Sequence, residues 1–336
     1  MHHLTYAEAI IVGLVQGVTE LFPVSSLGHN VLIPALVGGS WARDLNVSQK
    51  ESPYLAFIVG LHVATAIGLT AYFWRDWVRI IRGFFSSLRH MEIETPDQKL
   101  AWMIIFATIP VGLTGVIFEH KFRVFFGVPS RAAIFLVVNG VILFSAERFR
   151  TRKSREADAK ILAERQRQPE LVAAGAGAPG KINGAQHASG QRALRQEEVA
   201  TAVEADRRIT SYGFGEAVII GSAQILALLA GISRDGVAMT AGMFRGLSRE
   251  DAARFAFLLA TPVILAAGVL KVPDLFGHLG DGIRPQILAG SVVSGIGAYL
   301  SVRFLMKYFR TRTLTPFAIY CLVAGLASLI YLEFIK

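Results

Sequence analysis

Two stretches of this 336-residue chain carry one pattern: AEAIIVGLVQGVTELFPVSSLGHN at 7–30 and GEAVIIGSAQILALLAGISRDGVA at 215–238. A constant offset of 208 residues aligns them without a gap. Apolar residues match by chance easily, but shared Glu, Gln, Ser and Gly residues do not. Eight aligned pairs are identical: Glu8/Glu216, Ala9/Ala217, Ile11/Ile219, Gly13/Gly221, Gln16/Gln224, Leu21/Leu229, Ser25/Ser233 and Gly28/Gly236. The chain therefore contains an internal repeat.

Both repeat copies lie in longer apolar regions, residues 6–38 and 212–244, that are interrupted by Gly or Pro together with polar groups. A broken backbone at membrane depth is tolerated only where protein buries it or where it lines a wet cavity. We therefore expect two re-entrant helix–turn–helix hairpins. One alternative stays open, in which residues 6–38 form a single kinked span followed by a loop.

The composition around the hairpins is that of a membrane protein. Hydrophobic residues make up 53% of the chain and charged residues only 18%, and many of the charges lie between 147 and 208. Soluble domains average about 45–50% apolar and about 25% charged residues, so an ordinary soluble enzyme is excluded. The single cysteine, Cys321, excludes an internal disulfide. Six uncharged runs approach the ~20 residues that a bilayer span needs: Ser52–Trp74, Leu100–Phe118, Ala132–Ala146, Phe255–Leu270, Pro285–Val302 and Thr313–Leu332.

Three spans follow each hairpin, and an odd number of spans turns the second copy upside down relative to the first. The predicted fold is an all-α polytopic membrane protein built as an inverted repeat, each half a re-entrant hairpin plus three transmembrane helices. The first half is 1–149, with spans near 52–74, 100–118 and 131–149. A low-complexity insert occupies 150–210. The second half is 211–336, with spans near 252–270, 285–306 and 313–334.

Lys and Arg indicate the orientation of the chain. With the N-terminus outside, the expected inner segments hold 25 of the 34 Lys and Arg residues, and the outer segments hold eight. The positive-inside rule then places both termini outside and the insert 150–210 in the cytoplasm. The same rule explains the net charge of +9, so no nucleic-acid partner is expected. Within the insert, AAGAGAPGKINGAQHASGQ at 173–191 is typical of a disordered linker, and a regulatory segment is the alternative.

The first hairpin carries polar groups that are unusual inside a membrane. Ionisable side chains are costly there, so they indicate function by default. Gln16 and Glu20 are four residues apart and share one helix face. The turn that follows places two hydroxyls, of Ser25 and Ser26, near the imidazole of His29. Such a turn presents backbone N–H groups and hydroxyls to an anion. For the two serines, the plain alternative is that each hydroxyl satisfies a neighbouring carbonyl.

Arg234 lies in the corresponding turn of the second hairpin and is followed by Asp235. If the two turns meet, Arg234 faces the hydroxyls of the first turn, and a guanidinium with hydroxyls and amides suits a phosphate. Glu20 beside a diphosphate is repulsive unless a divalent cation, Mg²⁺ or Ca²⁺, lies between them. A serine near a His and a Glu acts as a nucleophile, or the same groups activate a water. A structural Arg234–Asp235 ion pair is the alternative.

Three further polar residues of the apolar regions are expected to be structural. Glu8 and Glu216 stand at the head of each hairpin, and we interpret them as interfacial or capping residues. His62 lies alone on an apolar span, where a structural role is the better interpretation.

GLVQGVTELFPVSSLGH at 13–29 resembles the first signature of the BacA-type undecaprenyl-diphosphate phosphatases, an (E/Q)xxxE pair followed by PxSSxGH. AGISRDG at 230–236 is similar to the second signature, PGxSRSG. The resemblance covers nearly the whole chain outside the insert. Two positions depart from it, because Ala230 replaces Pro and Asp235 replaces Ser. Asp235 either weakens phosphate affinity or helps to hold a metal, and Gln16 removes one of two carboxylate ligands.

The resemblance implies an integral-membrane phosphatase that converts undecaprenyl diphosphate to undecaprenyl phosphate and phosphate. This reaction recycles the lipid carrier of cell-wall synthesis, and an excess of the enzyme confers bacitracin resistance. The resemblance also implies a multi-pass protein of the bacterial inner membrane, an active site facing outside, a divalent metal, and a lipid-facing groove for the prenyl tail. The matching residues receive these roles: Glu20 as metal ligand or base, Ser26 as nucleophile, His29 as activator or proton donor, Arg234 as diphosphate clamp, and Gln16, Ser25, Gly28, Ser233 and Gly236 as substrate-binding residues.

A lipid-carrier flippase or transporter is the main alternative, because inverted repeats with broken helices are typical of transporters. The Glu, Ser, His and Arg set favours the enzyme, since transport alone does not need it. The lipid phosphatases with an SRxxxxxH motif are excluded, because Thr240 occupies the His position. The expected partners are undecaprenyl diphosphate and the lipid bilayer, with a homodimer left open.

Overall fold

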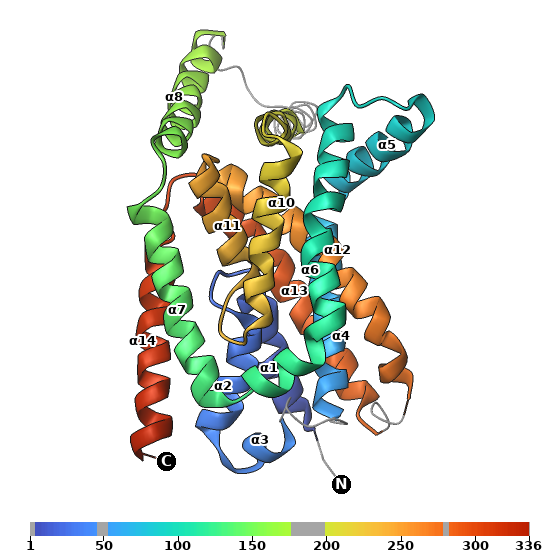
Figure 1. Cartoon of the computed structure of the whole chain (residues 1–336), viewed down its shortest axis with the longest axis vertical. Coiled ribbons are helices and arrows are strands. Elements are labelled where there is room, and N and C mark those ends of the chain that lie inside the picture. Colours follow the sequence, from blue (N-terminus) through green and yellow to red (C-terminus); the bar gives the residue numbers. More distant parts are fainter. Residues whose placement is uncertain (1–3, 46–52, 176–198, 278–281, 336) are drawn as a thin grey trace, which may run out of the picture.

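The computed structural model describes residues 4–45, 53–175, 199–277 and 282–335, and no strand occurs among them (Figure 1). The first half contains α1 (Tyr6–Thr19), α2 (Ser26–Val37), α3 (Gly39–Asp44), α4 (Pro53–Tyr72), α5 (Trp74–His90), α6 (Pro96–Phe126), α7 (Pro129–Arg148) and α8 (Arg152–Gly175). A helix at Val199–Thr210 precedes the second half. That half contains α10 (Phe214–Ala223), η1 (Gln224–Leu228), α11 (Arg234–Arg245), α12 (Arg249–Phe276), α13 (Arg284–Tyr308), α14 (Thr315–Ile330) and η3 (Tyr331–Ile335).

Five helical segments are long and apolar enough to cross a membrane: Pro96–Phe118, Pro129–Arg148, Arg249–Val269, Arg284–Tyr308 and Thr315–Phe334. They coincide with five of the six expected spans. The remaining span, expected at 52–74, corresponds to α4, which joins α5 at a bend of 84°. Residue 52 itself lies outside the described residues. The regular structure of the described residues is therefore all helical, with five to seven candidate membrane spans, as expected of a multi-pass membrane protein.

The bend between α4 and α5 follows a change in the character of the sequence. From Arg75 onward, charged residues recur among apolar ones, which suits a helix that lies along a membrane surface. Arg79 of α5 bonds to Asp76 at 2.6 Å, to Asp97 at 2.9 Å and to Asp206 at 2.7 Å. Charged residues from α5, α6 and the helix before α10 therefore gather at one end of the helical bundle.

The two broken segments begin in the same way. Glu8 of α1 accepts a hydrogen bond from the Thr5 N–H at 2.8 Å, and Glu216 of α10 accepts one from the Gly213 N–H at 2.5 Å. A carboxylate at the third helical position satisfies an N–H group that the helix leaves free. The predicted capping role of both glutamates is confirmed, and the two caps are in register with the sequence repeat.

The breaks within the two segments also match. Each break ends at a serine that caps the next helix. Ser25 accepts a hydrogen bond from the Gly28 N–H at 3.2 Å, and Ser233 accepts one from the Gly236 N–H at 3.1 Å. As a result, α2 and α11 begin at equivalent positions of the repeat.

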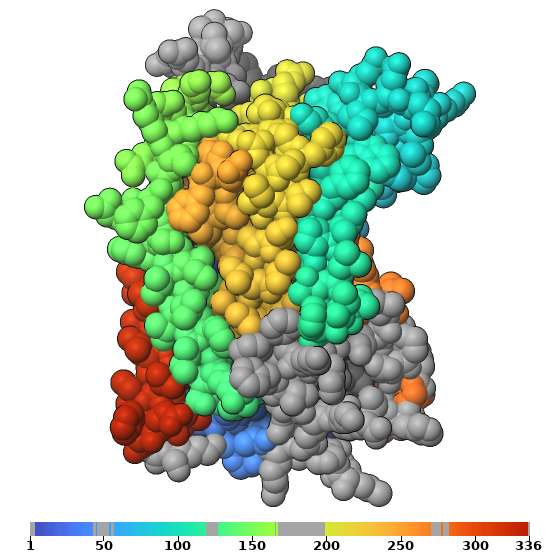
Figure 2. All heavy atoms as spheres, viewed as in Figure 1, coloured from blue at the N-terminus to red at the C-terminus, as the bar shows by residue number. Residues whose placement is uncertain are grey.

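The helices of the two halves pack crosswise. Helix α1 packs against α13, and its repeat equivalent α10 packs against α6. Helix α4 packs against α12, and α7 packs against α14. Small residues allow the closest contacts. A Cβ on Gly13 would lie 2.4 Å from the Gly290 oxygen, and a Cβ on its repeat equivalent Gly221 would lie 2.0 Å from the Ala107 oxygen. Figure 2 shows α10 and α11 between α6 and α7 on one face of the molecule.

Both ends of the expected insert 150–210 are held by charged contacts. Arg249, at the start of α12, bonds to Asp158 of α8 at 2.7 Å. Asp206, in the helix before α10, is buried and bonds to Arg254 of α12 at 2.8 Å. The middle of the insert lies outside the described residues. The flanking helices therefore belong to the packed protein, and the stretch between them stays a predicted linker.

Candidate active site

Glu20 follows α1 and lies at the centre of a buried polar cluster. Its Oε2 accepts hydrogen bonds from Gln16 Nε2 at 2.8 Å and from the Ser26 hydroxyl at 2.5 Å. The helical spacing of Gln16 and Glu20 places both side chains on one face. His62 Nε2 of α4 approaches the same oxygen at 3.4 Å. Glu20 is therefore held in place from three sides.

The turns of the two broken segments are in contact. The Gly231 N–H donates a hydrogen bond to Ser25 Oγ at 3.2 Å. A Cβ on Gly28 would lie 2.9 Å from the Gly231 Cα, so this approach requires glycine. Across the same contact, Arg234 Nη1 lies 3.8 Å from Glu20 Oε1. Residues predicted separately from the two repeat copies therefore line one site, to which both halves contribute.

The two serines of the first turn make different hydrogen bonds. Ser25 has a φ of +71°, which is uncommon for a residue with a side chain. Its Oγ accepts hydrogen bonds from the N–H groups of Gly28 and Gly231, both at 3.2 Å, and so ties its own turn to the opposite one. Ser26 instead donates its hydroxyl proton to Glu20. Of the two hydroxyls, the one on Ser26 has a base beside it.

His29 is engaged by partners other than the Ser26–Glu20 pair. Its Nδ1 bonds to the Ser25 carbonyl at 2.7 Å, and because a carbonyl can only accept, Nδ1 carries the proton. Its Nε2 then accepts from the Tyr320 hydroxyl at 2.7 Å, and the two rings stack. The resemblance gives His29 the role of activator or proton donor, and that role stays a prediction; the side chain that is hydrogen-bonded to the Ser26 hydroxyl is Glu20.

Comparison with known proteins bears on this site directly. The family described as bacitracin resistance protein BacA matches residues 9–170 and 185–327. The chain belongs to the BacA family. It is 56% identical over 330 residues to the undecaprenyl-diphosphatase of Mycolicibacterium paratuberculosis, covering 98% of both chains. It is 53% identical to undecaprenyl-diphosphatase 2 of Frankia alni over 97% of both chains, and 36% identical to undecaprenyl-diphosphatase 2 of Burkholderia orbicola over 95% of this chain and 94% of that one.

Asn139 of α7 links the two turns of this BacA family chain, and it was not predicted. The side chain is fully buried. Its Nδ2 donates to the Pro23 carbonyl at 2.9 Å, and its Oδ1 accepts from the Ser233 N–H at 3.0 Å. The signal that could have identified it is an amide in the middle of an expected span, where a polar side chain needs a partner.

Three more residues complete the cluster. Asn30 Nδ2 donates to Gln16 Oε1 at 2.6 Å, which orients the Gln16 amide so that its Nε2 faces Glu20. His62 was expected to be structural, and its Nδ1 does bond to a carbonyl of its own helix, but its Nε2 faces Glu20. Tyr320, which bonds to His29 from 291 residues further along the chain, was not predicted as a site residue.

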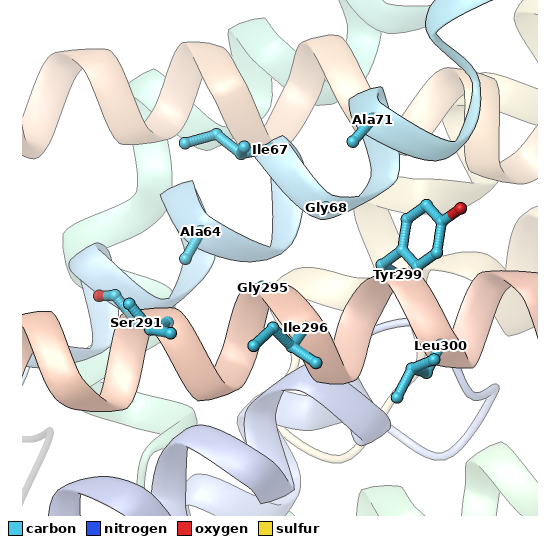
Figure 3. Close-up of a pocket in the computed structure, with 10 residues that line it drawn as sticks. Ala64, Ile67, Gly68, Ala71, Ser291, Gly295, Ile296, Tyr299 and Leu300 are labelled. Atoms are coloured by element: carbon cyan, nitrogen blue, oxygen red, sulfur yellow. The ribbon is translucent and has the colours of Figure 1, made fainter.

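An apolar groove of about 490 Å³ lies between α4 and α13 (Figure 3). Ala71 of α4 and Tyr299 of α13 are among the residues that line it. The two helices touch along the groove, since a Cβ on Gly68 would lie 2.4 Å from the Gly295 oxygen. The groove begins on α4 two residues after His62, so one helix carries both the groove and a member of the polar cluster.

Proposed function

We propose that this chain hydrolyses undecaprenyl diphosphate to undecaprenyl phosphate and inorganic phosphate. The observation that carries the proposal is the Ser26–Glu20 hydrogen bond, with Arg234 of the opposite turn 3.8 Å from the same carboxylate. A hydroxyl, a base and a fixed cation together suit phosphoryl transfer. The relatives named undecaprenyl-diphosphatase indicate the substrate, and nothing in their names supports the flippase alternative.

Arg234 is the proposed clamp for the diphosphate. Its Nη1 is shielded from solvent and has no hydrogen-bond partner in the part of the chain that the structure describes. Its distance of 3.8 Å from Glu20 is too long for a hydrogen bond, so the carboxylate does not occupy this donor. A guanidinium pairs its fork of N–H groups with two phosphate oxygens. Arg234 therefore has donors to offer to the substrate.

Ser26 is the proposed nucleophile, with Glu20 as its general base. As Ser26 Oγ bonds to the terminal phosphorus, its proton passes to Glu20, the bond from phosphorus to the bridging oxygen breaks, and undecaprenyl phosphate leaves. The proton passes from Glu20 to the departing undecaprenyl phosphate, which restores the carboxylate. A water then attacks the seryl phosphate while it loses a proton to Glu20, and that proton returns to Ser26 Oγ as the bond from Ser26 to phosphorus breaks and inorganic phosphate leaves. The Gln16 bond keeps the carboxylate oriented toward Ser26. Direct attack by a water held on Glu20 is the alternative, and it would leave substantial turnover in Ser26→Ala.

A divalent cation, Mg²⁺ or Ca²⁺, is part of the proposal, and Glu20 is suited to hold it. Oε2 of Glu20 is used by two donors, whereas Oε1 accepts no hydrogen bond from the described residues. Those residues contain no group of three His, Cys, Asp or Glu side chains that would form a complete metal site. Mg²⁺ commonly binds through one or two carboxylates and the phosphates of the substrate. Such an ion would offset the repulsion between Glu20 and the diphosphate.

We further propose an inverted repeat in the bacterial inner membrane, with the site open to the outside and residues 150–210 in the cytoplasm. Two observations support the repeat. Equivalent serines cap α2 and α11. Equivalent helices pack crosswise, α1 against α13 and α10 against α6. The excess of Lys and Arg in the segments assigned to the inside supports the orientation.

The groove between α4 and α13 is the proposed path of the prenyl chain. Its lining is apolar, and burying hydrocarbon is favourable by about 0.8 kcal/mol for each CH₂ group. His62 of α4 contacts Glu20 immediately before the groove begins. The lining residue Ala64 is two positions after His62 and points to the other side of α4, so a lipid whose diphosphate lies at the polar cluster would pass around α4 to lay its chain in the groove.

Phosphate release from farnesyl diphosphate by the purified protein in detergent tests the proposed function. We expect release in the presence of Mg²⁺ or Ca²⁺, and a loss of about a hundredfold or more in Arg234→Ala, which removes the charge that faces the phosphate. Glu216→Gln changes a carboxylate at a helix start away from the polar cluster and is the matched control. Failure of the wild-type chain to release phosphate with either cation would refute the proposed phosphatase activity.

A further inference from the structure

The two turns that meet at the active site contain two carboxylates, Glu20 and Asp235. Gln16 is neutral, so the first turn supplies one carboxylate where the BacA signature allows two. Asp235 comes from the opposite turn, directly after Arg234, and replaces the serine of that signature. The sequence left open whether Asp235 weakens phosphate binding or helps to hold a metal.

The carboxylate of Asp235 is buried without a partner. The residue is 1% exposed, and neither of its side-chain oxygens accepts a hydrogen bond within the described residues. A buried carboxylate normally has hydrogen bonds or a counter-ion, because removing its charge from water is costly. Its place in the first turn of α11 provides only a modest stabilisation by the helix dipole. The bonding capacity of Asp235 is therefore left for a ligand.

Two neighbouring groups also have unused bonding capacity. Arg234 Nη1 is shielded from solvent and makes no hydrogen bond to the described residues. Glu20 Oε1 lies 3.8 Å from this nitrogen, beyond hydrogen-bond distance. Asp235 directly follows Arg234 in the first turn of α11, and the hydrogen bond from the Gly231 N–H to Ser25 Oγ joins this turn to the one that carries Glu20. Two carboxylates and one guanidinium thus share a buried position, and one positive charge cannot balance both carboxylates and a diphosphate.

We propose that Asp235 and Glu20 together hold the divalent cation, and that the cation binds together with the diphosphate clamped by Arg234. Two carboxylates from opposite turns would leave the remaining coordination positions to phosphate oxygens and water, which is the arrangement that Mg²⁺ favours. In this chain Asp235 supplies the carboxylate that is missing at Gln16. The identity of the diphosphate rests on the proposed function, whereas the cation site rests on the unpartnered carboxylate.

A competing explanation is that Asp235 is a neutral, protonated acid that only fills space. The two explanations differ in what Asp235→Asn does. An asparagine keeps the size of the side chain but is a poorer cation ligand, so it disturbs a cation site and leaves a packing role intact. Asp235→Ser restores the residue of the BacA signature and serves as a second variant if Asp235→Asn does not fold.

Binding of Mn²⁺ to the purified full chain in detergent tests the site, with the non-hydrolysable farnesyl methylenediphosphonate present and free Mn²⁺ measured by electron paramagnetic resonance. We expect the Kd for Mn²⁺ to rise roughly tenfold or more in Asp235→Asn and Asp235→Ser. Glu216→Gln should bind Mn²⁺ as the wild-type chain does. A folded Asp235→Asn or Asp235→Ser protein with wild-type affinity for Mn²⁺ would overturn the proposal.

Failure of this inference and failure of the proposed function give different results, because Mn²⁺ binding is measured without turnover. If the wild-type chain binds Mn²⁺ through Asp235 but releases no phosphate from farnesyl diphosphate, the function fails and the cation site stands. If it releases phosphate and Asp235→Asn binds Mn²⁺ unchanged, the function stands and the cation site is overturned.

Discussion

Replacing Asn139 by leucine should loosen the contact between the two turns, because this one side chain bonds to both. The change removes the donor to the Pro23 carbonyl at 2.9 Å and the acceptor for the Ser233 N–H at 3.0 Å, while leucine keeps the branching and the number of heavy atoms of the side chain. The Ser233 N–H then has no partner among the described residues, and the Pro23 carbonyl keeps only the weak contact with Cys321 Sγ at 3.9 Å. A buried backbone group that loses its partner costs about 1–3 kcal/mol, so the pair costs roughly 2–6 kcal/mol. The lower figure alone corresponds to about a thirtyfold change in the equilibrium between joined and separated turns.

Two measurements follow the consequences of Asn139→Leu. We expect a lower midpoint of thermal unfolding in detergent and phosphate release from farnesyl diphosphate that is slower by about tenfold or more. The matched control is Thr261→Val, which removes a buried hydroxyl that bonds within α12 to the Phe257 carbonyl at 3.0 Å. An Asn139→Leu protein with the midpoint and the turnover of the wild-type chain would refute the positioning role of Asn139.

Ser26→Ala should slow phosphate release by about a hundredfold or more with little change in the unfolding midpoint, because it removes the nucleophile and no structural bond between the turns. Ser25→Ala should lower the midpoint, since two buried N–H groups lose their acceptor, and identical behaviour of the two variants would contradict these separate roles. Ala71→Trp fills the groove and should slow the hydrolysis of undecaprenyl diphosphate but not that of farnesyl diphosphate. The control Val116→Trp, on the exposed face of α6, should slow neither reaction. Equal slowing of both substrates by Ala71→Trp would argue against the groove as the path of the prenyl tail. A short Gly-Ser linker in place of 176–198 should leave turnover unchanged, and a large loss would show that the insert is more than a spacer.

The part of the site that repeats in the sequence could be predicted. Ser25 and Ser233 stand at the same offset from two broken helices, and both cap the helix that follows. Glu20 and Arg234 stand out in different copies because charged groups at membrane depth are rare, and the structure brings them within 3.8 Å. These residues share a property that a single sequence displays, which is a polar group at a break in an apolar segment.

The rest of the site depends on which helix covers which face, and periodicity does not contain that information. Helical spacing places His62 on a face of its span, but only the packing of α4 against α1 brings that face to Glu20. Tyr320 reaches His29 in the same way from α14, and Asn139 reaches both turns from α7. The sequence therefore indicates the structural contact of His62 with its own helix but not its contact with Glu20.

The first span and the insert show the same limit at the level of the fold. The uncharged run 52–74 predicts one helix, and α4 does end at Tyr72, but the run says nothing of the 84° bend into α5. The insert has the composition of a linker, yet Asp158 and Asp206 at its two ends make ion pairs with α12. Composition predicts that a segment can be a linker, but it does not show which of its residues are held against the helical bundle by ion pairs.

The decisive measurement is phosphate release from undecaprenyl diphosphate by the wild-type chain and by two variants, one from each turn, Glu20→Gln and Arg234→Ala. If the two turns form one active centre, the wild-type chain releases phosphate and both folded variants are slower by about a hundredfold or more. Release by either variant at the wild-type rate would contradict a catalytic centre that is shared between the two halves of the chain.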